Sequence, residues 1–214
     1  MKTLYSVILL IALTAYGSAQ ATFESAMQGT LRQFDSSKTD QQMKDAAARF
    51  ERIAAAEPSQ WLPRYYSSFI YIVLSFKTTD NAEKQSYIDY AQKQLDEALK
   101  IAPEESELYT LQGMLYQSTI MLDPAKYGQI YSGKAAGAYQ KASQLDPSNP
   151  RPVYLQGVSI MHTPEQYGGG KKAALPIFTK AMGLFADFSP MSEIYPQWGK
   201  DECQKYLAMC KENQ

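Results

Sequence analysis

Apolar residues recur three and four positions apart through most of the chain, as at Leu95, Ala98 and Leu99. This spacing places apolar side chains on one face of an α-helix, whereas a half-buried strand needs strict alternation of apolar and polar residues. Alternating runs of strand length are absent from the sequence after residue 21. The pattern therefore predicts an all-α protein.

One pattern occurs four times: alanine, an aromatic residue or leucine four positions on, alanine or isoleucine three later, and usually proline five later. The copies are Ala46-Phe50-Ile53-Pro58, Ala91-Leu95-Ala98-Pro103, Ala135-Tyr139-Ala142-Pro147 and Ala174-Phe178-Ala181, with Ala186 in place of the last proline. Ten positions after each proline stands a small residue, Ser68, Gly113 or Gly157. Such self-similarity at a fixed period is typical of helical repeats.

The residue types explain how these units pack. A small residue lets two antiparallel helices approach closely, and a bulky residue one turn away fills the space beside them. Proline cannot continue a helix, so it separates one helix pair from the next. A single pair cannot bury its own apolar face, so the pairs are expected to stack into a solenoid.

The repeats resemble the tetratricopeptide repeat (TPR) family. The third copy matches the TPR pattern best, at Tyr109, Gly113, Tyr116, Ala135, Tyr139, Ala142 and Pro147. The resemblance implies a right-handed solenoid of four helical hairpins over residues 22–188. Residues 189–214 are expected to form a linker and a C-terminal capping helix, whose buried stripe holds Trp198, Cys203, Leu207 and Cys210.

The spacing departs from the family pattern. The small residue and the first alanine of the second helix lie 23 positions apart between Ser68 and Ala91, and 22 apart between Gly113 and Ala135. A standard repeat has 12, so each hairpin carries extra residues, as longer helices or as loops. The inserts are expected at 77–85, 123–133 and 163–172, on one edge of the stack.

Residues 1–21 read as a secretory signal peptide. Lys2 supplies the positive charge, an apolar run extends from Leu4 to about Ala15, and small residues favour cleavage after Ala19 or Ala21. The run is shorter than the roughly 20 residues that span a bilayer. A lipid anchor would need a cysteine near the cleavage site, and the sequence has none there. The prediction is a periplasmic or secreted protein without stable membrane insertion.

Charge and cysteine content limit the function classes. The net charge of −1, from 21 basic and 22 acidic residues, gives no basic stripe for nucleic acid. Cys203 and Cys210 are seven positions apart, about 10.5 Å along a helix, which exceeds the Cα separation of about 7 Å that a disulfide allows. We expect two buried thiols that do not pair with each other.

Few residues suggest chemistry. Gly168, Gly169, Gly170 and Lys171 precede a predicted helix and could bind an anion through free N–H groups, or they form only a tight turn. The spacing is not that of a P-loop. His162 is the sole histidine, so no metal site, cofactor or catalytic residue is predicted. Glu104, Glu105 and Glu107 are assigned to the dipole of a helix N-terminus.

In the TPR arrangement the first helix of each pair lines a concave groove. The resemblance assigns to this groove Leu62, Tyr65, Phe69, Thr110, Met114, Gln117, Arg151, Tyr154, Met161 and His162. Either this face is open, or the inserts or the capping helix cover it. The predicted function is a scaffold that binds a protein or peptide segment of the cell envelope. The alternatives are a periplasmic solute-binding or transport-accessory subunit and, less favoured, a hydrolase.

Overall fold

The computed structural model describes residues 22–212, and the predicted signal peptide lies outside this range. Residues 22–35 form the first helix. The others are α2 (Asp40–Ala56), α3 (Leu62–Lys77), α4 (Asn81–Ile101), α5 (Ser106–Ile120), α6 (Pro124–Leu145), α7 (Pro150–His162), the short 3₁₀ helix η1 (Glu165–Tyr167), α8 (Lys171–Asp187) and α9 (Lys200–Lys211). The predicted all-α class is confirmed for the described residues.

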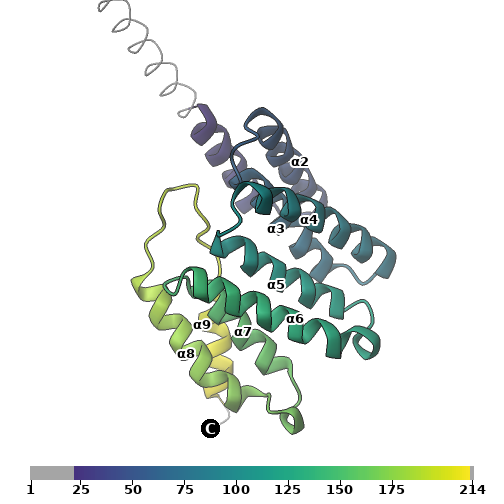
Figure 1. Cartoon of the computed structure of the whole chain (residues 1–214), viewed down its shortest axis with the longest axis vertical. Coiled ribbons are helices and arrows are strands. Elements are labelled where there is room, and N and C mark those ends of the chain that lie inside the picture. The colour runs from purple at the N-terminus through teal and green to yellow at the C-terminus, as the bar shows by residue number, and fades with distance from the viewer. Residues whose placement is uncertain (1–21, 213–214) are drawn as a thin grey trace, which may run out of the picture.

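The helices pair as hairpins and the hairpins stack (Figure 1). Helix 22–35 lies beside α2, followed by the pairs α3 with α4, α5 with α6 and α7 with α8. Among the first helices, α5 contacts both α3 and α7, so the three share one layer of the stack. Helix α9 packs against α8 and ends the solenoid.

The small residues of the repeat mark the closest approaches between paired helices. A Cβ atom on Gly113 would lie 2.2 Å from Cε1 of Tyr139, and one on Gly157 would lie 2.8 Å from Cε1 of Phe178. Ser68 uses its hydroxyl in the same place, donating to the carbonyl of Ala91 at 3.0 Å. The small and bulky positions of the sequence pattern therefore face each other across each hairpin.

Helix starts follow from local side chains. Asp80 accepts from the N–H groups of Ala82 and Glu83 at the start of α4, and Asp123 and Asn149 cap α6 and α7 in the same way. These bonds satisfy N–H groups that have no partner within the helix. Prolines at the first turn of α6 and α7 fit there because their missing N–H is not needed.

Two of the three inserts are additional helical turns. Because α4 begins at Asn81 and α6 at Pro124, residues 77–85 and 123–133 are mostly helical. Helix α4 has 21 residues and α6 has 22, so the middle two hairpins extend further than the others. The third insert, residues 163–172, instead contains η1 and a glycine turn.

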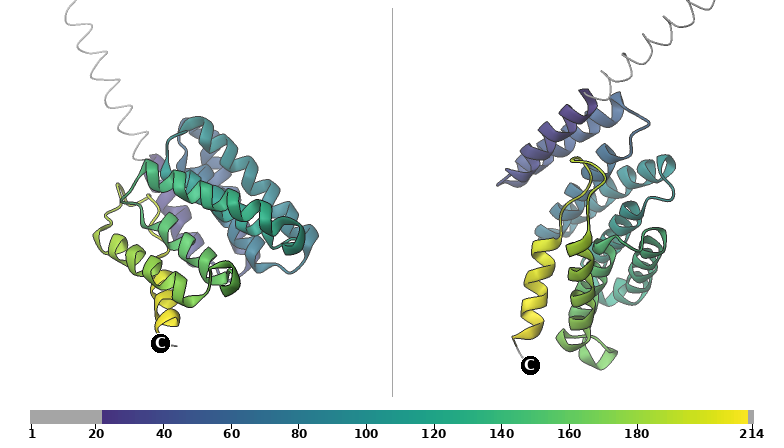
Figure 2. Two further views of the ribbon diagram at one scale, coloured as in Figure 1. Left: turned by 60° about the horizontal axis from the view of Figure 1, so that its bottom comes forward. Right: turned by 90° about the vertical axis from the view of Figure 1, so that its left-hand side faces the viewer.

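Residues 188–199, named the strap here, join α8 to α9. The strap leaves the end of α8, runs toward the N-terminal hairpins and returns to α9 (Figures 1 and 2). Trp198 belongs to the strap, so its assignment to the capping helix was wrong: Gly199, with φ of 102°, turns the chain before α9 begins. Cys203 and Cys210 are buried on α9 as free thiols.

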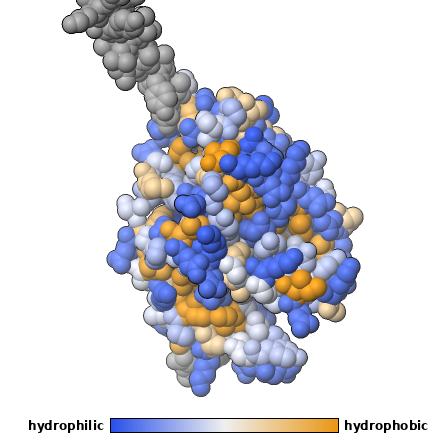
Figure 3. Space-filling view, viewed as in Figure 1, coloured by the Kyte–Doolittle hydropathy of each residue, from blue (hydrophilic) through white to orange (hydrophobic). Residues whose placement is uncertain are grey.

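The outer surface alternates between hydrophilic side chains and separate apolar patches on the face that Figure 3 shows. Within the described range, no helix has the length and apolar character to cross a membrane.

Candidate binding cleft beside the strap

A buried ion pair lies between α5 and α7. Arg151 Nη1 and Glu107 Oε1 are 2.9 Å apart, and neither side chain is exposed. Tyr65 donates to Glu107 Oε2 at 2.9 Å, and Asn149 donates to Oε1 at 2.7 Å. Burial raises the pKa of Glu107, while the Arg151 guanidinium and the two donors oppose that rise. Glu107 is therefore part of an interhelical network, and the helix-dipole role falls to Glu105, which caps α5.

The strap is bound to this network and to α3, α5 and α7. Arg151 donates to the carbonyl of Pro196, and Tyr66 donates to that of Ile194 at 2.9 Å. Tyr195 donates to Glu105 at 3.0 Å. The strap thus fastens α3, α5 and α7 together.

Aromatic packing holds the end of the strap. Trp198 stacks on Phe69 with ring centroids 4.8 Å apart and planes at 19°. The Arg151 guanidinium lies 4.6 Å from the ring centroid of Phe188 and 5.6 Å from that of Trp198. A charge close to aromatic rings is stabilised by cation–π attraction, which is stronger where water is excluded.

Most of the residues assigned to the groove are not open to solvent. Those buried are Leu62, Tyr65, Phe69, Thr110, Met114, Arg151 and Tyr154; Gln117 and Met161 are half-buried, and His162 is exposed. Tyr65, Phe69 and Arg151 contact the strap directly, whereas Tyr154 packs against Phe185 and Tyr206. An extended partner reaches the middle of this face only if the strap leaves it.

The N–H groups of the glycine turn before α8 already donate to backbone carbonyls of the protein. Gly168 donates to Glu165, Gly169 to Pro164 and Gly170 to Ile160, at 2.9, 3.2 and 2.9 Å. Gly168 and Gly170 have φ of 81° and 91°, a region that suits glycine. The three amides on which the anion hypothesis depended are engaged within the turn, and Lys171 is half-buried at its end.

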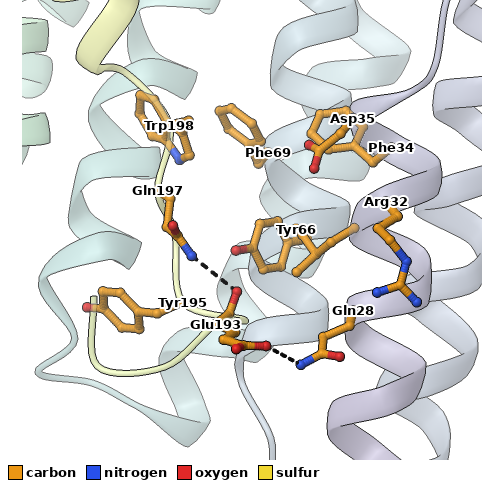
Figure 4. Close-up of a pocket in the computed structure, with 11 residues that line it drawn as sticks. Gln28, Arg32, Phe34, Asp35, Tyr66, Phe69, Glu193, Tyr195, Gln197 and Trp198 are labelled. Atoms are coloured by element: carbon orange, nitrogen blue, oxygen red, sulfur yellow. Dashed lines mark hydrogen bonds between the residues drawn. The ribbon is translucent and has the colours of Figure 1, made fainter. Parts of the chain in front are cut away.

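An open cleft of about 460 Å³ remains between helix 22–35, α3 and the strap (Figure 4). Its apolar lining comes from Leu31, Phe34, Phe69 and Trp198. Its polar lining comes from Gln28, Arg32, Asp35, Tyr66, Glu193, Tyr195 and Gln197.

Hydrogen bonds fix one side of the cleft. Gln28 donates to Glu193 Oε2 at 2.7 Å, which joins helix 22–35 to the strap, and Gln197 donates to the backbone carbonyl of Glu193 at 3.2 Å. Arg32 and Asp35 lie on the opposite side, where each side chain is partly open to solvent. Partial burial raises the pKa of Asp35. The cleft therefore combines an aromatic wall with a charged rim.

The sequence pattern assigned none of Gln28, Leu31, Arg32 and Phe34 to a site. Helix 22–35 lacks the close glycine contact of the later hairpins: a Cβ on Gly29 would meet only the far end of Arg32, at 4.0 Å. The sequence of the strap has no helical periodicity, so no pattern in it predicted that the strap would lie on the groove. Of the residues that line the cleft, the TPR resemblance assigned only Phe69 to the groove.

No protein-family model matches the chain, and comparison with curated proteins finds no match. Among solved structures, the HusA haemophore from Porphyromonas gingivalis superimposes with a TM-score of 0.80 and 29% sequence identity, covering 90% of this chain and 94% of that chain.

A thermophilic TPR protein of Thermus thermophilus superimposes with a TM-score of 0.56 and 15% identity, covering 92% of this chain and 95% of that chain. At this identity the likeness concerns the fold alone. Together with the four copies of the repeat pattern, it confirms the resemblance noted in the sequence: this chain has the fold of a TPR-like helical-repeat protein.

Proposed function

We propose that this protein binds haem or a related porphyrin in the cleft between helix 22–35, α3 and the strap. The observation that carries the proposal is the likeness to a haemophore along nearly the whole chain, at 29% identity. The function is equilibrium binding of a ligand, and no catalytic step is proposed.

The cleft has the size and lining for such a ligand. Sites for small molecules and cofactors have volumes of about 300–1,000 Å³ and are lined mainly by apolar and aromatic groups, and this cleft has about 460 Å³. Phe34, Phe69 and Trp198 offer ring faces and edges to a planar macrocycle. Arg32 at the rim is placed to pair with a carboxylate of the porphyrin.

The lining also indicates which side chains could coordinate the haem iron. Haem iron is held in proteins by histidine, cysteine, methionine or tyrosine. Within residues 22–212, only tyrosine among these lines the cleft, as Tyr66 and Tyr195. Both phenol groups donate hydrogen bonds, to Ile194 and Glu105. We expect the ring system and carboxylates to supply most of the affinity.

A peptide-binding scaffold is the second candidate, favoured by one observation. The strap is itself an extended segment that lies along α3, α5 and α7, so this face accepts an extended chain. A partner segment from the cell envelope would have to displace the strap and its hydrogen bonds. Export to the periplasm or the medium, from the predicted signal peptide, suits either candidate.

The test is a titration of the purified protein with haem, followed by the Soret absorbance. Wild type is expected to saturate at a fixed stoichiometry. Arg32→Glu reverses the rim charge and is expected to weaken binding about five- to tenfold, equivalent to about 1–1.4 kcal/mol. Arg49→Glu makes the same change at an exposed position of α2 that does not line the cleft, and its Kd should match wild type.

Phe34→Ser removes part of the aromatic wall and is expected to weaken binding by a similar factor. Equal affinities in wild type, Arg32→Glu and Phe34→Ser would remove the cleft as the binding site. Non-saturating binding by the wild type would remove the porphyrin proposal itself.

A further inference from the structure

The additional turns of the two middle hairpins form a second pocket. It lies between α4, α5 and α6, away from the strap, and has a volume of about 250 Å³. Its lining comprises Tyr116, Tyr127, Tyr131, Thr119, Leu122 and Lys134 from the α5–α6 hairpin, and Gln85, Ile88, Asp89 and Gln92 from α4. Tyr127, Tyr131 and Gln85 belong to the inserts that distinguish this chain from a standard repeat.

Three tyrosine rings stand at different angles in this pocket. The ring centroids of Tyr116 and Tyr131 are 5.7 Å apart with planes at 50°, and those of Tyr127 and Tyr131 are 5.7 Å apart with planes at 84°. The rings therefore do not form one flat stack. Rings inclined to one another present more than one face to a group in the pocket, which is the arrangement of an aromatic cage.

A cation already lies against these faces. The ammonium of Lys134 is 4.7 Å from the ring centroid of Tyr131 and 5.8 Å from that of Tyr116. Both distances are within the roughly 6 Å at which the ring quadrupole attracts a cation. The position of Lys134 shows that one positive group can contact two of the rings at once. Its long side chain is exposed, so it can leave without disturbing the core.

We propose that this pocket binds a quaternary ammonium group, such as that of choline, in the place of the Lys134 ammonium. A trimethylammonium group is larger and more weakly hydrated than the lysine ammonium, so it gains more from contact with several rings. The carboxylate of Asp89 lines the same pocket and favours a positive ligand. The site lies apart from the haem cleft and does not depend on the proposed function.

The direct experiment is a titration with choline chloride, followed by the amide chemical shifts of the protein. Saturable shifts are expected at residues around Tyr116 and Tyr131. The uncharged analogue 3,3-dimethylbutanol has the same shape and is expected to bind at least tenfold more weakly. Equal binding of the two molecules would overturn the proposal, because shape alone would then explain it.

One variant is expected to raise the affinity for choline instead of lowering it. Lys134→Ala removes the ammonium that lies over Tyr116 and Tyr131, while Lys126 over Tyr127 is left in place, and is expected to tighten choline binding about two- to fivefold. Lys141→Ala is the matched control, because Lys141 lies over Tyr109 and does not line this pocket. An unchanged or weaker affinity in Lys134→Ala would contradict the competition.

Tyr131→Ala should lower choline affinity at least tenfold, whereas Tyr131→Phe keeps the ring face and should bind within about twofold of wild type. Loss of binding in both variants would point to the hydroxyl and overturn the cage. Sedimentation with phosphatidylcholine vesicles then identifies the source: cosedimentation that free choline competes away indicates a lipid headgroup, and choline binding without cosedimentation indicates a small molecule.

Discussion

The indole Nε1 of Trp198 donates a hydrogen bond of 2.7 Å to the phenol oxygen of Tyr65, across 133 positions of sequence. The Tyr65 hydroxyl donates a hydrogen bond to Glu107, which forms an ion pair with Arg151. Arg151 in turn donates to the carbonyl of Pro196 in the strap. The polar contacts thus form a closed circuit from the strap through α3, α5 and α7 and back to the strap.

Loss of Trp198 should free the strap. Trp198→Ala removes the hydrogen bond to Tyr65 and the stack on Phe69. We expect trypsin to cleave after Lys200 at least tenfold faster than in wild type under native conditions, because cleavage requires local opening. The measurement is the rate of appearance of the fragment, by mass spectrometry.

Met191→Ala is the control for this experiment, since Met191 lies in the same strap but is 77% exposed. Its cleavage rate should equal that of wild type. If Trp198→Ala is cleaved no faster than Met191→Ala, Trp198 does not hold the strap.

The buried ion pair makes a second prediction. Arg151→Met leaves the Glu107 carboxylate without its partner in a dry site and should lower the free energy of unfolding by about 3–5 kcal/mol. The double variant Glu107→Gln with Arg151→Met removes both charges and should recover part of that loss. Urea denaturation of the wild type, the single variants Arg151→Met and Glu107→Gln, and the double variant measures this coupling, and strictly additive losses would contradict it.

The glycines of the repeat make a third prediction. Gly113→Ala places a methyl group 2.2 Å from the Tyr139 ring and should lower the free energy of unfolding by about 1–3 kcal/mol. Gly137→Ala is the matched control in the neighbouring helix, where a Cβ meets no atom within 4 Å. It should stabilise by about 0.5–1 kcal/mol through helix propensity. Thermal denaturation that shows the same change for both would contradict this account of the hairpin contact.

These glycines show what the sequence could predict. Gly113 and Gly157 are identified by their spacing from Pro103 and Pro147, and the structure places them against Tyr139 and Phe178. Local periodicity fixes which face of each helix is buried, so the stack of hairpins follows from it. The spacing of the inserts was enough to predict their sites but left helix and loop undecided.

The cleft could not be predicted in this way. It needs the strap, whose contacts join Trp198 to Tyr65 and Tyr195 to Glu105 over long sequence separations, without any period. The TPR resemblance predicted a groove because a standard repeat has no such segment. Trp198 is identifiable as a buried aromatic residue, yet its spacing from Cys203 also allows a helical stripe, which placed it wrongly on α9.

The thiols of α9 make a fourth prediction. Burial raises the pKa of Cys203 to about 12, so the native thiol stays protonated at pH 8 and should react with a disulfide reagent at least a hundredfold more slowly than in unfolded protein. Burial also raises the pKa of Cys210, although Lys171 opposes this. Cys210→Ser isolates Cys203 for the measurement.

The same shift has a consequence for stability. The folded state holds the Cys203 proton more tightly than the unfolded state, so this contribution is fully present below pH 9 and is lost as the pH rises toward 12. Cys203→Ala should therefore flatten the fall of the free energy of unfolding in that range. An unchanged slope, or rapid reaction of Cys203 at pH 8, would show that the thiol is not buried.

The most direct test of the binding cleft uses Trp198 as its reporter. In a Trp61→Phe background Trp198 is the one remaining tryptophan, and it lines the cleft beside Phe69. We predict that haem quenches its fluorescence in step with the rise of the Soret band, with one shared stoichiometric end point, and that Arg32→Glu shifts both curves equally. A saturating Soret change that leaves Trp198 emission unaffected would place the ligand elsewhere and contradict the account.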